Sequence, residues 1–177
     1  MKNILITTDF SHNASHAAEY IMNLFQYEAC TFHILHVVKA SSFISDDLMN
    51  MKPSSSLYTQ IIESEKVKLE EAVKQLDNRF NNILHKLVPI IDYDNFLGAI
   101  SQCVEKNSIE LVVMGTKGAT NSLKKIIGSN TMRVIRNSTV PVLAIPSNYA
   151  FRPVHKILFT TTYQKDYKKS ELKILID

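Results

Sequence analysis

Short apolar runs alternate with longer amphipathic stretches along most of this 177-residue chain. The short runs are rich in β-branched residues and predict buried strands at residues 4–8, 31–38, 83–91, 109–114 and 140–145. Apolar residues recur at helical spacing over residues 12–27, 59–81, 96–107 and 129–137. Alternation of this kind predicts an α/β fold, a doubly wound parallel sheet with helices on both faces.

One internal segment and the end of the chain lie outside this pattern. Residues 39–58 are rich in serine and show no apolar period. A loop of that length in a compact domain is usually functional or mobile. Its apolar residues either cover a ligand or partner, or belong to a poorly ordered insertion, and the sequence leaves both interpretations open.

The composition narrows the class of protein. The apolar fraction of 45% is ordinary for a globular domain, and no apolar run is long enough to span a membrane. The N-terminus leads directly into the first predicted strand without a secretory signal. Cys30 and Cys103 are isolated in sequence and are predicted to fill the core. These features predict a cytoplasmic protein without a disulfide framework.

A glycine-containing loop between the fourth strand and the last helix is the strongest candidate for chemistry. It holds Gly115, Gly118 and Gly128, three of the four glycines in the chain, and Ser129 follows directly. Glycines let backbone N–H groups approach an anion, and a helix start adds free N–H donors. The alternative is that these glycines only form turns. The strand before them and the helix after them favour a phosphate-binding loop.

The charge distribution points to the same stretch. Residues 111–165 contain eight Lys or Arg residues and no Asp or Glu, although the whole chain has a net charge of only +3. An anionic ligand suits this basic block better than a neutral one. Because no helix-turn-helix pattern accompanies it, we expect no nucleic-acid partner.

Other site chemistries lack their sequence signatures. The loop is neither a G-K-[S/T] phosphate loop nor a G-x-G-x-x-G dinucleotide fingerprint. His33 and His36 point to opposite faces of their predicted strand, so they are not expected to share a metal. No residue has the sequence context of an activated nucleophile or a γ-phosphate-positioning base. Any hydrolysis is therefore expected to be slow.

The spacing G-2x-G-9x-G-[S/T] resembles the ATP-binding signature of the universal stress protein family. The resemblance covers about the first 147 residues and includes the strand that ends at Asp9 and the stretch Thr139 to Pro146. It implies an adenine nucleotide alpha hydrolase-like fold, with five strands in the order 3-2-1-4-5. It also implies binding of ATP, or of AMP or ADP, since family members with this signature bind ATP.

The resemblance assigns roles around one crevice, where the ends of the first and fourth strands face each other. Asp9 would bind ribose hydroxyls or help to hold Mg²⁺ with the phosphates. Val37 or Val38 would meet the adenine edge through backbone groups. The remaining expected contacts are Thr7 and Thr8 on the sugar or base side, Met114 near the nucleotide, and Gly115, Gly118, Gly128, Ser129, Asn130 and Thr131 on the phosphates. Lys117, Lys124 and Lys125 would neutralise phosphate charge or simply be solvated.

The last residues repeat the beginning of the chain. Residues 157–163 (ILFTTTY) echo residues 4–10 (ILITTDF). The sequence therefore predicts one domain over residues 1–147, followed at 148–177 by a linker and the first strand of an apparently truncated second repeat. Such a strand must pack on the first domain, pair with another chain or be disordered.

Three functions remain open from the sequence. The leading hypothesis is a nucleotide-binding regulatory module with at most slow ATP hydrolysis. The second is an interaction protein with an empty site, a homodimer that pairs through the strand Val140 to Ile145. The third is an enzyme of the adenine nucleotide alpha hydrolase group.

Overall fold

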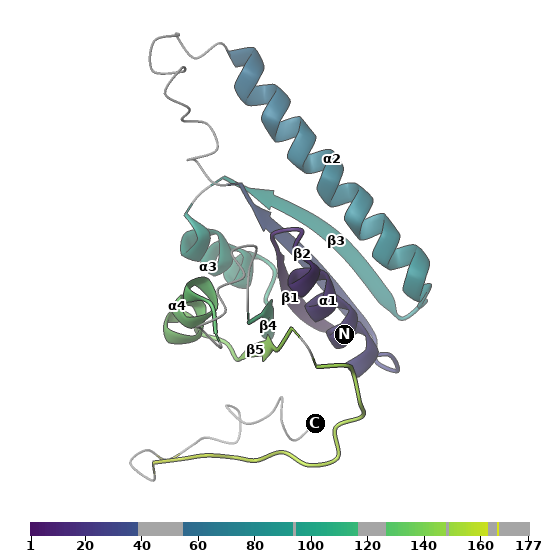
Figure 1. Cartoon of the computed structure of the whole chain (residues 1–177), viewed down its shortest axis with the longest axis vertical. Helices are drawn as coiled ribbons and strands as arrows, with labels where there is room; N and C mark the ends of the chain where they lie inside the picture. Colours follow the sequence, from purple (N-terminus) through teal and green to yellow (C-terminus); the bar gives the residue numbers. More distant parts are fainter. Residues whose placement is uncertain (39–54, 94, 117–126, 148, 163–165, 167–177) are drawn as a thin grey trace.

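The computed structural model describes residues 1–38, 55–93, 95–116, 127–147, 149–162 and 166, with the side chains of 55–59 and 61 left out (Figure 1). Helices and strands alternate along these ranges. The elements are β1 (Lys2–Thr8), α1 (His12–Leu24), β2 (Cys30–Val37), α2 (Ser55–Phe80), β3 (His85–Asp92), α3 (Phe96–Lys106), β4 (Leu111–Gly115), α4 (Ser129–Asn137) and β5 (Val142–Ile145). The predicted α/β architecture is confirmed.

The strands form one parallel sheet in the order β3-β2-β1-β4-β5, as predicted. β1 pairs with β2 over its whole length and with β4 along its other edge, where Ile6 lies beside Val113. The chain therefore winds outward from β1 in both directions. The reversal of strand order falls between β1 and β4, the place where ligands bind in open parallel sheets.

Most element boundaries differ by a few residues from those predicted, for local reasons. α1 ends at Leu24 because Phe25, with φ −102° and ψ 23°, has left the helical conformation. β5 begins at Val142 and not at Val140, because Pro141 has no N–H and the hydroxyl of Ser138 engages Val140 in a turn. Periodicity predicts where an element lies better than where it stops.

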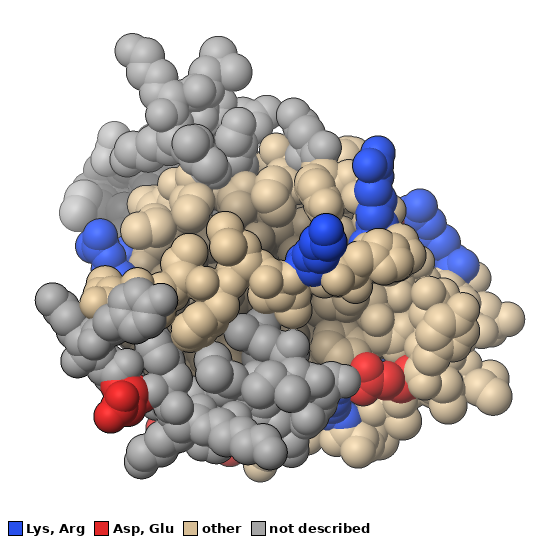
Figure 2. Space-filling model, turned by 90° about the horizontal axis from the view of Figure 1, so that it is seen from below, with Lys and Arg blue, Asp and Glu red and all other residues tan. Residues whose placement is uncertain are grey.

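Charged side chains are spread over the surface that the structure describes. Arg133 and Arg136 on α4 are exposed, as are Arg152 and Lys156 after β5. The other four members of the predicted basic block, Lys117, Lys124, Lys125 and Lys165, lie outside the described residues. Figure 2, seen from below the view of Figure 1, shows Lys and Arg side chains separated by uncharged surface. On this face the basic residues do not join into one patch.

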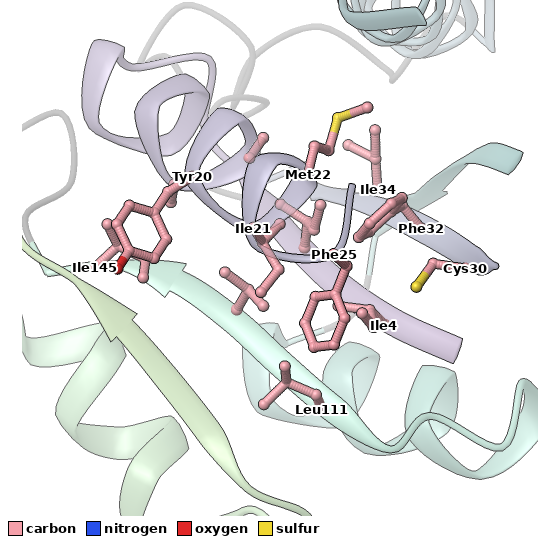
Figure 3. Close-up of a cluster of buried hydrophobic side chains, with 14 of the residues drawn as sticks. Ile4, Tyr20, Ile21, Met22, Phe25, Cys30, Phe32, Ile34, Leu111 and Ile145 are labelled. Atoms are coloured by element: carbon pink, nitrogen blue, oxygen red, sulfur yellow. The ribbon is translucent and has the colours of Figure 1, made fainter. Parts of the chain in front are cut away.

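Helices cover both faces of the sheet and bury a core on each. Ile21 of α1 and Phe25, which follows this helix, point toward the sheet near Ile4, and Met22 of α1 belongs to the same buried cluster (Figure 3). The opposite face packs α3 and α4 against β1, β2 and β4 in a second cluster. Each fully buried aliphatic or aromatic side chain contributes about 1.5–3 kcal/mol, so the two cores together fix the sheet that carries the strand ends.

Both cysteines are buried and unpaired, as predicted for core residues. Burial raises the pKa of the Cys30 thiol to about 11, chiefly because the thiolate would lose its hydration. The pKa of Cys103 is also raised by burial. Neither thiol is an activated nucleophile. Within the described part of the chain, no helix combines the length and apolar character that crossing a bilayer requires.

For the residues after β5, the beginning of a second repeat expected from their likeness to residues 4–10 stays a prediction. Residues 151–162 have neither helix nor strand, and Leu158 and Phe159 are exposed. A strand needs a neighbour to complete its ladder, and Figure 1 shows this tail leaving the sheet beyond β5. The tail is attached at its beginning, where Phe151 lies edge-on to Tyr20 of α1 with ring centroids 5.3 Å apart.

His33 is a buried titratable residue in the middle of β2. The residue is only 7% exposed, and neither ring nitrogen has a hydrogen-bond partner among the described residues. Burial lowers its pKa, and the nearby positive charge of Lys86 lowers it further. The folded protein therefore holds this imidazole in its neutral form at neutral pH.

This histidine should make the protein sensitive to mild acid. As the pH falls below about 6.5, the ordinary pKa of histidine, the unfolded chain binds a proton that the folded state accepts only at lower pH. Stability is therefore present above that pH and is lost below it. His33→Leu should reduce the fall in melting temperature between about pH 7 and about pH 5, where carboxylates still stay largely ionised. The exposed His12→Leu is the control, and equal pH slopes in all three proteins would contradict the prediction.

Candidate functional site

The carboxyl end of β4 lies directly against the first turn of α1. A Cβ atom placed on Gly115 would stand 2.9 Å from the backbone oxygen of Asn13 and 3.1 Å from its carbonyl carbon. Because both neighbours are backbone atoms, no side-chain rotation can make room. Gly115 is therefore a packing requirement of the fold, and it brings the end of β4 to the turn between β1 and α1.

The turn after β1 is built around Asp9. The Asp9 carboxylate accepts hydrogen bonds from the N–H of Ser11 at 3.1 Å and from its hydroxyl at 2.5 Å. Ser11 in turn caps α1 by accepting from the N–H of Ala14 at 3.3 Å. Asp9 is exposed, so this network holds its carboxylate at the surface beside the helix start.

Phe10 has an unusual backbone conformation in the same turn. Its φ of 60° lies in the left-handed region, which a bulky residue rarely adopts. The hydroxyl of Thr8 accepts from its N–H at 3.1 Å, and its ring stacks on His36 with centroids 4.4 Å apart. His36 donates from Nδ1 to the Thr8 carbonyl at 2.9 Å. These contacts stabilise the turn that presents Asp9.

The start of α4 is different, because no side chain caps it. Gly128 occupies the capping position without a side-chain hydrogen bond, and the first helical bond is donated by Met132. The N–H groups of residues 129–131 precede that bond, so they are available as donors, with the positive end of the helix dipole behind them. Gly128 has φ −65° and ψ 156°, angles open to any residue, so its backbone does not itself require glycine.

Two further bonds hold this helix start against the end of β4. The N–H of Gly128 donates to the carbonyl of Thr116, which closes the neck of the glycine loop. The hydroxyl of Thr131 donates to the carbonyl of Gly115 at 3.0 Å. The N–H donors of residues 129–131, which have no partner among the described residues, are therefore held near the end of β4.

A cavity of about 120 Å³ lies between these elements. Its lining residues come from β1, α1, α3, β4 and α4. They are Thr7, Thr8, Asp9, Ala14, Phe96, Met114, Gly115, Gly128, Ser129, Asn130 and Thr131. Nine of these eleven residues are among the residues that were assigned to the crevice from the sequence. Asp9 and the start of α4 thus line one cavity.

Several predicted site residues lie elsewhere. Val37 and Val38 are not among the lining residues, so their contact with adenine stays a prediction. Val38 is buried, and its N–H donates to the carbonyl of Asp92 at 2.9 Å. Gly118 and the lysines of the glycine loop, Lys117, Lys124 and Lys125, lie outside the described residues.

Sequence reasoning missed two lining residues, Ala14 and Phe96. Both belong to the apolar patterns of the helices predicted at residues 12–27 and 96–107. Phe96 is the first residue of α3, which Asn95 caps by accepting from the N–H of Gly98 at 2.8 Å. Because α3 follows β3, its first turn lies at the carboxyl edge of the sheet. The position of this helix start, directly after a strand, was the signal that could have identified Phe96 as a lining residue.

Residues 1–146 match the sequence model of the universal stress protein family. The chain is similar to universal stress protein MJ0577 of Methanocaldococcus jannaschii, with 25% identity over 156 residues that cover 81% of this chain and 94% of that protein. The solved structure of MJ0577 superposes with a TM-score of 0.67 at 27% identity, covering 82% of this chain and 95% of the other.

Two more distant solved structures share the fold. UspA from Lactobacillus plantarum superposes with a TM-score of 0.68 at 22% identity, covering 81% of this chain and 97% of the other. The Arabidopsis thaliana protein At3g01520, solved with AMP bound, gives a TM-score of 0.56 at 15% identity, covering 84% and 93%. At these identities the likeness concerns the fold.

The contact of Gly115 with α1 yields a stability prediction. Gly115→Ala should lower the free energy of unfolding by about 1–3 kcal/mol, the usual cost of overpacking, because the added methyl overlaps the Asn13 backbone. Gly98→Ala, inside helix α3, is the matched control and should be neutral or stabilising by about 0.5–1 kcal/mol. Urea unfolding measures both. If Gly115→Ala is as stable as the parent protein, the close approach is not a constraint.

Proposed function

Since the chain belongs to the universal stress protein family, we propose that it binds an adenine nucleotide, ATP in preference, in the cavity at the ends of β1 and β4. The observation that carries this proposal is the uncapped start of α4 in a cavity that also contains Asp9. Unpaired N–H donors at a helix start suit phosphate. The carboxylate of Asp9 suits the hydroxyl groups of a sugar.

The cavity is too small for a whole nucleotide, so we propose that the nucleotide occupies two regions of the protein surface. At about 120 Å³ it is smaller than the ~300–1,000 Å³ of typical small-molecule sites, so it fits part of ATP. We assign the phosphates to Gly128, Ser129 and the N–H groups that follow. The adenine is assigned to the side of Val37 and Val38, beyond the cavity's own lining. Phe96, at the carboxyl edge of the sheet, offers an apolar ring to the nucleotide.

Asp9 has two proposed uses. It accepts from ribose hydroxyls, or it holds Mg²⁺ together with phosphate oxygens. Among the described residues that line the cavity, Asp9 alone carries a carboxylate, and one of its oxygens already accepts from Ser11. A bound Mg²⁺ would therefore take most of its ligands from phosphate and water, as this ion usually does.

Binding and not turnover is the proposed activity. A fast ATPase positions a base or an arginine around the γ-phosphate. Among the described residues, the cavity lining contains no Arg, Lys or His, and the carboxylate of Asp9 accepts from Ser11, the residue that caps α1. We therefore propose hydrolysis slower than about 1 s⁻¹, the lower end of ordinary enzyme rates. The bound AMP of At3g01520, a protein of the same fold, is compatible with nucleotide binding in this architecture.

Calorimetry with two substitutions tests the phosphate assignment. Gly128→Val should weaken ATP binding at least about tenfold, or about 1.4 kcal/mol, because a branched side chain keeps phosphate away from the N–H groups of α4. Ser129→Ala should weaken it less, by about 0.5–1.5 kcal/mol for one lost hydroxyl bond. AMP should be less affected than ATP, since it has fewer phosphates at the helix start.

The controls separate lost binding from lost folding. Gly98→Ala and Ser101→Ala change the same residue types on α3, away from the cavity lining, and should leave the dissociation constant unchanged. Melting temperatures identify any variant that fails to fold. ATP affinity that is equal in the parent protein and in a folded Gly128→Val would rule out the phosphate assignment. No detectable binding of ATP, AMP or GTP to the parent protein would rule out the function.

The second candidate function is self-association through β5, and it rests on the position of that strand. β5 is the last strand of the sheet and pairs with β4 alone among the described strands. Pro141 and Ile145 turn their carbonyls to β4, where they accept from the N–H groups of Val112 and Thr116. By the alternation of a strand, Ala144 then directs its N–H to the open edge. We propose that β5 pairs with β5 of a second copy.

Ala144→Pro tests this edge without removing a bond to β4. It should convert a dimer to a monomer, because proline cannot donate the outward hydrogen bond yet is tolerated on an edge strand. Light scattering after size-exclusion chromatography measures the mass, and circular dichroism confirms the fold. A parent protein that runs as a monomer, or a variant that stays dimeric, would exclude pairing through this edge.

The likeness of residues 157–163 to residues 4–10 supports one further assignment. We propose that residues 148–177 are a linker and the beginning of a second repeat that follows a domain spanning 1–147. The packing of Phe151 on Tyr20 anchors the linker to α1. The strand itself would form only beside a further strand.

A further inference from the structure

His36, near the end of β2, connects three parts of the fold. Its Nδ1 donates to the carbonyl of Thr8 at 2.9 Å, and its Nε2 lies 3.5 Å from a carboxylate oxygen of Glu65 on α2. Its ring stacks on Phe10, with the centroids 4.4 Å apart. The side chains of His36 and Glu65 are only 11% and 20% exposed, so water screens these contacts little. The imidazole is therefore held through both of its nitrogens and through one face.

Glu65 is itself held in place on α2. One oxygen of its carboxylate accepts from Lys68 at 2.8 Å, and the other oxygen is the one that faces His36. Polar side chains that are linked in this way reinforce one another. The series Lys68, Glu65, His36 therefore ties α2 to the carbonyl of Thr8 at the end of β1.

This tie meets the chain on both sides of Asp9. Thr8 precedes Asp9 and Phe10 follows it, and His36 contacts both. Phe10 has φ 60°, a conformation that a bulky residue keeps only where its surroundings impose it. His36 and Glu65 are not among the described residues that line the cavity. Their effect on a ligand would therefore pass through the direction in which the turn presents the Asp9 carboxylate.

We propose that His36 is a positioning residue of the nucleotide site and sets its preference for a ribose. This inference rests on the proposed function, and of the two uses proposed for Asp9 it takes the contact with ribose hydroxyls. A hydrogen bond weakens steeply as its angle closes, so a carboxylate selects a sugar by its hydroxyls only when its direction is fixed. His36 fixes that direction by holding both neighbours of Asp9, and Glu65 keeps the ring in place.

Calorimetry of the full chain with ATP and 2′,3′-dideoxy-ATP tests this role. The parent protein should bind ATP at least about tenfold more tightly, because the dideoxy compound lacks the hydroxyls that would donate to a charged group. His36→Leu should reduce this ratio to less than about threefold, through weaker ATP binding. A general loss of structure would instead lower both affinities together.

Two further substitutions at histidine separate positioning from bulk. His36→Asn keeps an N–H donor near the place of Nδ1 and should retain most of the preference for ATP over the dideoxy compound. His155→Leu makes the same change as His36→Leu at an exposed position after β5, and should leave the preference as in the parent protein.

The connection to α2 is tested with Glu65→Ala. It should lower the ratio of the two affinities in the same direction as His36→Leu but by less, because Thr8 and Phe10 still contact the ring. Glu71→Ala removes an exposed carboxylate from the same helix and should leave the ratio unchanged. Equal ratios in these two variants would remove Glu65 from the assignment.

A measurement on the parent protein covers the case in which His36→Leu fails to fold. The NMR signals of the His36 ring nitrogens should move more on saturation with ATP than with 2′,3′-dideoxy-ATP. Equal movement would overturn the inference, and so would equal ratios in folded His36→Leu and His155→Leu. A parent protein that binds both nucleotides equally would also overturn it, yet would leave the phosphate assignment intact. Absence of binding to either nucleotide would rule out the proposed function and this inference together.

Discussion

The contact between Gly115 and the backbone of Asn13 is the constraint on which the site depends. A parallel sheet places the ends of β1 and β4 side by side, yet the helices that follow them need not meet. The missing side chain at Gly115 lets the first turn of α1 approach β4 to within a distance that a Cβ atom could not share. The bond from Thr131 to the Gly115 carbonyl then brings in α4. One small residue thus joins two helix starts at one edge.

The starts of α1 and α4 differ in whether a side chain caps them. α1 is capped by Ser11, and Asp9 supports the cap, so its first N–H groups have partners within the protein. α4 begins at Gly128, which has no side chain to offer. Glycine in the capping position costs only about a few tenths of a kcal/mol relative to Ser, Thr, Asn or Asp, so the helix tolerates the missing side-chain bond. A bound anion would restore that interaction, which is why an uncapped start facing a cavity points to a ligand.

The two hollows beside α1 are bordered by different parts of the secondary structure. The cavity at the strand ends exposes backbone N–H groups, hydroxyls and a carboxylate, since strands and helices end there and leave polar groups unpaired. The hollow between α1 and α2 lies along the sides of helices, where the backbone groups are already paired. Its lining combines apolar side chains with Thr8, Ser15 and Gln75 and with the Glu19–Arg79 ion pair.

Much of this protein follows from local sequence. The apolar periods predicted every helix and strand that the structure describes, α4 included, because this signal acts between near neighbours in the chain. Nine cavity residues were predicted for the same reason: each sits at a strand end or a helix start. Tertiary structure alone decided that Phe96 joins them and that α1 and α2 leave a hollow between them. These outcomes depend on the distance between segments far apart in sequence, which no local pattern encodes.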